Sequence, residues 1–71
     1  MIEFQLKEDS DYIELIKLLK VVNLVSSGAE AKQLVEDGRV KLNGTIEDKK
    51  RAKVRSGDIV DIEGQQVTVL K

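Results

Sequence analysis

The sequence predicts an α+β fold in which two short helices pack on a small, mainly antiparallel sheet, in the order β-α-α-β-β-β-β. Three observations predict it. The chain opens on a segment that alternates apolar and polar residues, continues with two segments of helical periodicity, and ends with short alternating segments separated by turn residues. Because the chain has 71 residues, we expect one domain over residues 1–71.

The first strand and the first helix follow from residue spacing near the N-terminus. Residues 2–7, IEFQLK, alternate apolar and polar side chains, which predicts a half-buried strand. Asp11 and Glu14 lie three positions apart, the spacing of a capping box at a helix start. Apolar residues from Tyr12 to Val22 recur every three or four positions, which predicts that this stretch is helical.

A second helix is predicted from about Gly28 to Asp37. Ser27 and Glu30 give a second capping-box pattern at its start. Gly38 follows it and can adopt the left-handed conformation in which many helices end. Apolar residues at helical spacing give this helix one narrow face that can be buried.

Two hairpins are predicted in the C-terminal half. Residues 39–42, RVKL, alternate polar and apolar side chains, which predicts a strand. Asn43 and Gly44 follow, and this pair is the strongest two-residue hairpin signal, because both central positions of a type I′ turn need a positive φ. TIE forms the returning strand. The second hairpin joins IVDI to QVTVL through Glu63 and Gly64.

The composition argues against catalysis. The chain has no Cys and no His, which excludes disulfides, thiolate nucleophiles, histidine acid–base chemistry and the usual zinc sites. It has no Gly-rich phosphate loop, and we expect so small a domain to lack an apolar pocket of useful size. With only one Phe and one Tyr, a platform for stacked bases is not expected. We therefore predict a protein that is not an enzyme and needs no cofactor.

Neither a membrane segment nor a metal site is expected. No apolar run approaches the ~20 residues of a membrane-spanning helix. The N-terminal MIEFQLKEDSD is unlike a secretory signal, so a cytoplasmic location is expected. The acidic residues near the N-terminus lack the spacing of a calcium-binding loop and fit the acidic start of a helix better. These residues are Glu8, Asp9, Asp11 and Glu14.

Charge is unevenly distributed along the chain. The formal net charge is −1, yet residues 1–16 carry −4, residues 17–55 carry +5 and residues 56–71 carry −2. Local charge, more than the total, decides where an anion is attracted. The densest cluster lies within EDKKRAKVRSGD, where five of the seven residues from Lys49 to Arg55 are basic.

Two interpretations of this basic stretch are open. It is a solvated loop, or it is a contact surface for something anionic. An extended chain would place Arg51, Lys53 and Arg55 on one side, and Ala52 and Val54 on the other. Such a strand buries its two apolar residues and presents three cations in a row, which favours the contact surface.

The run from Leu15 to Asp58 resembles the RNA-binding domain named after ribosomal protein S-four, also called the alpha-L RNA-binding motif. The matching positions keep one unbroken register over more than half of the chain. They are Leu15, Leu19, Leu24, Ser27, Ala31, Leu34, Val35, Gly38, Val40, Leu42, Asn43, Gly44, Gly57, Asp58 and Ile59. The chain is most similar to the small stand-alone bacterial members of the YbcJ type, which share the S-G-x-E-A-K opening of the second helix and a basic loop after the hairpin.

The chain departs from the family pattern at four positions. Glu14 and Ile16 stand where the family has a leading Arg and Asp. Asn23 replaces a frequent glycine after the first helix. Gly28 stands where the family has a bridging Arg, although bare backbone at a helix N-terminus still favours an anion.

The resemblance implies a non-catalytic, monomeric protein that docks on structured RNA, ribosomal or another stem-loop RNA, through a basic face. The family-like core is expected at about residues 12–62, and the ribosome or translation factors are possible partners. The residues expected to contact RNA are Lys17, Lys20, Ser27, Gly28, Lys32, Lys41, Lys49, Lys50, Arg51, Lys53 and Arg55. Few aromatic residues are available to hold bases, so recognition is expected to depend mainly on shape and phosphates.

Several alternatives stay open at this stage. The same basic face can serve a protein–protein adaptor of the translation or ribosome-assembly machinery, or the domain can be a structural one that has lost RNA binding. Lys32 can simply pair with Glu36 one turn later. Ser27 can be a structural cap alone, and Asn43 with Gly44 can be a turn and nothing more.

Overall fold

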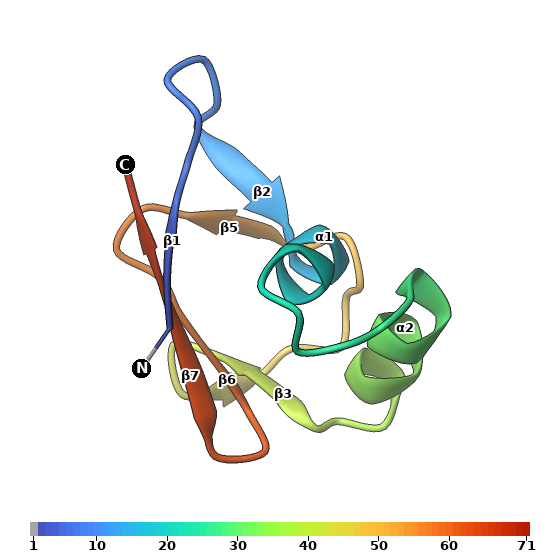
Figure 1. The fold of residues 1–71 in the computed structure, drawn as a ribbon. Coiled ribbons are helices and arrows are strands. Elements are labelled where there is room, and N and C mark those ends of the chain that lie inside the picture. Colours follow the sequence, from blue (N-terminus) through green and yellow to red (C-terminus); the bar gives the residue numbers. More distant parts are fainter. Residues whose placement is uncertain (1) are drawn as a thin grey trace.

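Nine secondary-structure elements follow one another in the computed structural model, which describes residues 2–71 (Figure 1). The elements are β1 (Ile2–Gln5), β2 (Tyr12–Glu14), α1 (Leu15–Val21), α2 (Gly28–Glu36), β3 (Val40–Leu42), β4 (Thr45–Ile46), β5 (Lys53–Arg55), β6 (Ile59–Ile62) and β7 (Gln65–Leu70). The predicted α+β class is confirmed, with two strands more than the predicted order contained, β2 and β5.

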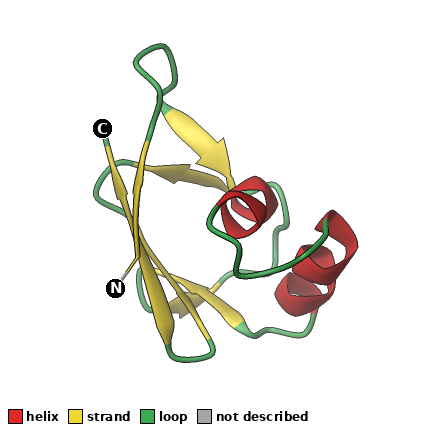
Figure 2. Ribbon diagram, in the orientation of Figure 1, coloured by secondary structure: helices red, strands yellow, loops and turns green. Residues whose placement is uncertain are grey.

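The strands form two sheets. The larger has the order β1-β7-β6-β3-β4, in which β1 runs parallel to β7 and every other neighbouring pair is antiparallel. The smaller is an antiparallel ribbon of β2 and β5. Both helices lie on the same side of the larger sheet (Figure 2). The sheet is therefore mixed but mainly antiparallel, as predicted.

The core lies between the helices and one face of the larger sheet. It contains Leu6, Leu15, Leu18, Leu19, Val25, Ala31, Val35, Val40, Val54, Val60, Ile62, Val67 and Val69. Along β3, Val40 is buried while Lys41 is exposed, and along β6, Val60 and Ile62 are buried on either side of Asp61. Since successive strand residues point to opposite faces, Lys41 and Asp61 lie on the outer face of the sheet, away from the helices.

The predicted start of the first helix was wrong. Tyr12, Ile13 and Glu14 form β2 and pair with β5, so α1 begins only at Leu15. Glu14 occupies the N-cap position without a side-chain cap bond, and the carboxylate of Asp11 binds Lys71 instead. The capping box predicted from Asp11 and Glu14 does not form, because pairing with a distant strand decides the conformation of three residues that helical periodicity alone cannot fix.

Backbone carbonyl groups just before β5 cap the N-terminus of α1. The N–H of Leu15 donates to the carbonyl oxygen of Ala52 over 2.9 Å, and the N–H of Ile16 donates to that of Lys50 over 3.3 Å. The first N–H groups of a helix have no partner inside the helix, so an external acceptor stabilises them. The start of α1 and the segment around residues 50–52 are therefore fixed to each other.

Local turn signals were read correctly. Asn43 and Gly44 have φ values of 53° and 86°, as a type I′ turn requires. The Asn43 side chain does more than turn the chain: its Nδ2 donates to the Asp58 carboxylate over 3.0 Å, and its Oδ1 accepts from the Ile59 N–H over 2.9 Å. The view of Asn43 as a turn residue and nothing more was wrong, since its amide ties the first hairpin to the turn before β6.

Candidate nucleic-acid interface

Five cationic side chains stand out from one segment of the surface. We call Lys49, Lys50, Arg51, Lys53 and Arg55 the basic segment; all five are exposed, while Ala52 is half-buried and Val54 is fully buried. The strand covers only the last three positions, and Arg51 lies in the turn before it. The predicted alternation of exposed cations and apolar residues is nevertheless present from residue 51 to residue 55.

The backbone of the basic segment is held at both ends. The carbonyl oxygens of Lys50 and Ala52 accept from the start of α1, and the N–H of Arg55 donates to the Asp58 carboxylate over 2.8 Å. β5 also pairs with β2 along its length. Figure 1 shows this connection, in yellow to orange, running past α1. The side chains therefore project from a fixed backbone rather than from a loose loop.

Within residues 2–71, none of the five cations forms an ion pair. Within the described residues 2–71, the ion pairs join Arg39 to Glu63 at 3.4 Å and Lys71 to Asp11 at 3.3 Å. The nearest cross-strand acid is Glu14, which lies opposite Lys53 in the β2–β5 ribbon without forming an ion pair. The basic segment therefore presents charge to solvent, and charge of this kind attracts anions.

α1 connects the basic segment to the start of α2. Lys20 lies one turn beyond Ile16, whose N–H binds the Lys50 carbonyl, so the two share one side of the helix. A Cβ added to Gly28 would lie 3.9 Å from the Cδ of Lys20. Lys32 follows Gly28 by four residues on the same face of α2. Lys20, Gly28 and Lys32 therefore lie close together at the start of α2, and α1 also contacts the backbone of the basic segment at its own start.

The N-terminus of α2 is occupied mainly by its own cap. The Ser27 hydroxyl oxygen accepts from the Glu30 N–H over 3.2 Å, as predicted. The Glu30 carboxylate accepts from the N–H of Ser26 over 2.7 Å and from its hydroxyl over 3.0 Å, rather than from the Ser27 N–H that a capping box would use.

Two hydrogen bonds lower the pKa of the Glu30 carboxyl: the bond from the Ser26 N–H has the larger effect, and the bond from the Ser26 hydroxyl adds to it. A charged carboxylate therefore stands at the end of α2 where an anion would bind. It offsets part of the favourable helix dipole. Ser27 serves the helix as a cap, and the basic segment is the stronger feature of this surface.

Two predicted site residues lie apart from this surface. Lys41 lies in β3 on the outer face of the larger sheet, opposite Ile46 of β4 on one side and Asp61 of β6 on the other. Lys17 is exposed on α1, where it lines a groove on the side of the N-terminal strands. Lys32 makes no ion pair with Glu36 in the part of the chain that the structure describes.

The expectation that no apolar pocket of useful size fits stays a prediction, because the groove found here is open and is lined by charged as well as apolar side chains. An open groove of about 660 Å³ lies between β1, the loop after it, β2 and α1. Its lining consists of Phe4, Leu6, Lys7, Asp9, Ser10, Asp11, Tyr12, Ile13, Glu14, Lys17 and Val21. The groove forms at the surface, where a loop stands away from α1, and so does not need a large core. Three of the N-terminal acids line it, instead of beginning a helix as predicted.

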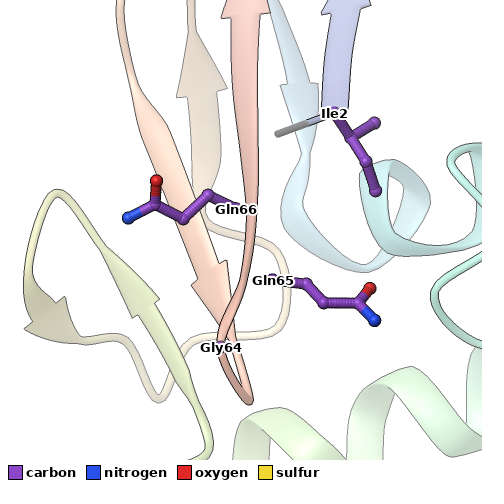
Figure 3. A pocket seen from close by; sticks show the side chains of 4 residues that line it. All are labelled: Ile2, Gly64, Gln65 and Gln66. Atoms are coloured by element: carbon purple, nitrogen blue, oxygen red, sulfur yellow. The ribbon is translucent and has the colours of Figure 1, made fainter.

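A smaller pocket of about 320 Å³ lies at the turn between β6 and β7 (Figure 3). Ile2, Gly64, Gln65 and Gln66 line it, and none of them has a titratable side chain. Among the described residues, no three His, Cys, Asp or Glu side chains are grouped so that they could hold a metal ion. Charge on this molecule is concentrated elsewhere, on the basic segment.

Tyr12 is the surface residue that sequence reasoning missed. It was assigned to the apolar stripe of a helix, yet it lies on β2 opposite Arg55 with 41% of its surface exposed. The Nζ of Lys53 lies 5.0 Å from the centre of its ring. The available signal was weak: over three residues Tyr-Ile-Glu fits a strand as well as a helix, and Tyr and Ile are both common in strands.

Comparison with known proteins decides the family. The model of the S4 domain matches residues 4–70. This chain belongs to the S4 domain family. The YbcJ protein of Escherichia coli (strain K12), named as a candidate RNA-binding protein, is 39% identical over 59 residues, which is 83% of this chain and 84% of the relative. The uncharacterised YbcJ protein of Shigella flexneri matches to the same extent.

Solved structures show the same S4-type fold. The solution structure of E. coli YbcJ, described as having an αL motif involved in RNA binding, matches with a TM-score of 0.75 and 37% identity over 100% of this chain and 89% of that one. The 30S ribosomal protein S4e of Thermoplasma acidophilum matches with a TM-score of 0.68 and 22% identity, over 82% of this chain and 31% of that one. The second likeness concerns the fold alone.

The departures from the S4 pattern now have a structural setting. Asn23 has a φ of 62°, so it provides the left-handed residue after α1 that a glycine often provides. Gly28 has no positive φ, so its backbone would accept a side chain. Among the helices of residues 2–71, none is long and apolar enough to cross a membrane.

Proposed function

We propose that this S4-domain protein binds structured RNA, ribosomal or another stem-loop RNA, without catalysing a reaction. The observation that carries the proposal is the basic segment: five exposed cations that form no ion pair within residues 2–71, on a backbone that α1, β2 and Asp58 hold in place. Cations on a fixed backbone suit the regular phosphates of folded RNA, because little backbone order has to be gained on binding.

Lys20, Gly28 and Lys32 extend the proposed interface across the two helices. The Lys20 side chain lies beside the start of α2, where the Gly28 and Ala29 N–H groups find no acceptor within residues 2–71. Lys41 falls outside the interface because it lies on the other face of the sheet. Contacts of this kind position a protein on the RNA backbone and read shape more than sequence.

The salt dependence of binding tests this proposal. If the basic segment neutralises about five phosphates, the logarithm of the association constant should fall with the logarithm of salt concentration with a slope of about −4. Fluorescence anisotropy of a labelled stem-loop RNA, measured from about 50 to 300 mM KCl, gives the slope. A slope near zero, or no binding at low salt, would show that the face is not an RNA-binding surface. Capture from lysate that survives ribonuclease would then favour the protein–protein adaptor.

Restoring the family arginine is expected to strengthen binding. Gly28→Arg should tighten the stem-loop complex about three- to tenfold and steepen the salt slope by about one, because it adds one phosphate contact. The backbone can accept the residue, since the added Cβ meets Lys20 only at ordinary contact distance. Gly28→Gln is the matched control, because it adds a chain of similar polarity without the charge. Equal affinity for the Arg and Gln variants would remove Gly28 from the proposed interface.

A further inference from the structure

One aromatic ring adjoins the basic segment on the outer face of the β2–β5 ribbon. Tyr12 is 41% exposed and lies directly opposite Arg55, while the Nζ of Lys53 lies 5.0 Å from its ring centre. Ile13 and Val54, the next pair along the ribbon, point the other way, and Val54 is fully buried. The ribbon therefore presents an aromatic ring with two cations of β5 beside it.

The contact between Lys53 and Tyr12 does not close this surface. A cation over an exposed ring is a weak interaction, whereas stacking of a nucleobase on an aromatic ring is stronger and accepts any base. A base can therefore replace the ammonium group on the ring. Lys53 sits on a strand edge where its long side chain can then turn towards the phosphate of the same nucleotide.

Nearby acids restrict where that phosphate can lie. Glu14 faces Lys53 across the ribbon, and Asp11 precedes Tyr12 and is paired with Lys71. Both carboxylates would repel a phosphate on their side of the ring. Near Arg55 the Asp58 carboxylate is already bound by the Arg55 backbone N–H, so the base belongs over Tyr12 and its phosphate between the side chains of Lys53 and Arg55.

We propose that Tyr12, Lys53 and Arg55 bind one unpaired nucleotide that adjoins the structured RNA held by the basic segment. The inference rests on the proposed function and adds a preference for a junction between duplex and single strand. An RNA backbone that leaves the turn at residues 49–51 along β5 reaches the ring next, since Arg51, Lys53 and Arg55 project from the same side. Unpaired bases are the parts of RNA that can be splayed out and stacked on aromatic rings.

Tyrosine fluorescence can test the inference directly, because Tyr12 is the only tyrosine and the chain has no tryptophan. The probes are one blunt-ended RNA duplex without a loop and the same duplex with four unpaired nucleotides added at either the 5′ or the 3′ end of one strand. We expect an extended RNA to bind about tenfold tighter than the blunt one and to quench the fluorescence, which the blunt one leaves nearly unchanged. Titration of N-acetyltyrosinamide corrects for absorption by the RNA.

Two variants separate the ring from the rest of the ribbon. Tyr12→Leu should bind blunt and extended RNA with equal affinity, while Tyr12→Phe should keep the preference. Equal binding of both RNAs by the original protein, without quenching, would overturn the inference and leave the proposed function standing. Absence of salt-dependent binding to either RNA would overturn both. If Tyr12→Leu fails to fold, the quenching measured on the original protein still shows whether a nucleotide contacts the Tyr12 ring.

Discussion

Replacing Lys49, Lys50 and Arg51 together by glutamate is expected to weaken binding of a stem-loop RNA by at least about 100-fold at 100 mM salt. Three of the five cations become anions, so attraction of phosphate turns into repulsion. The fold should survive, because the exposed side chains make no ion pair in residues 2–71 and α1 is held by backbone carbonyl oxygens that every residue type has. Anisotropy titrations measure the affinity, and circular dichroism melting shows whether the variant is folded.

A single reversal on the other face of the sheet is the matched control for position. Lys50→Glu should weaken binding about fivefold, whereas Lys41→Glu, an equal change in charge, should weaken it less than about twofold. Lys41 is exposed like Lys50 but projects from the outer face of β3, away from both helices. Unchanged affinity in the triple variant would refute the proposed interface, and equal losses for the two single variants would show that only net charge matters.

The parts of the fold that depend on near neighbours could be predicted from the sequence. The turn at Asn43 and Gly44, the cap at Ser27 and the exposed alternation in the basic segment are set by short-range geometry and by period-two spacing. β2 could not be predicted in this way. Its three residues fit a helix or a strand equally, and the choice is made by β5, which lies far along the chain.

The composition of the candidate site was easier to predict than its geometry. Clustered charge at residues 49–55 is visible in the sequence, but its neighbours depend on topology. Lys41 was expected to contact RNA together with the other cations, but the alternation along β3 places it on the outer face of the larger sheet, away from the helices. Tyr12 belongs to the candidate surface because the pairing of β2 with β5 places its ring beside Lys53. The register of the β2–β5 pair thus decides which side chains lie close enough together to contact the same RNA.

Leu19→Ala is expected to lower the free energy of unfolding by about 3 to 5 kcal/mol. Leu19 lies in α1, is fully buried, and belongs to the core cluster between the helices and the larger sheet. Its truncation leaves a cavity that a small, tightly packed core can only partly fill. Domains have about 0.05 to 0.15 kcal/mol of stability per residue, so the loss approaches the whole stability of a 71-residue chain. Urea unfolding followed by circular dichroism measures the change.

Val21→Ala, in the same helix, is the matched control. Val21 is 55% exposed, so its truncation should change the free energy of unfolding by less than about 0.5 kcal/mol. The comparison also bears on RNA binding, because the start of α1 binds the carbonyl oxygens of Lys50 and Ala52. Partial unfolding of α1 in Leu19→Ala should therefore release the basic segment and weaken RNA binding although no cation is lost. Equal stability of the two variants would contradict a core that depends on α1.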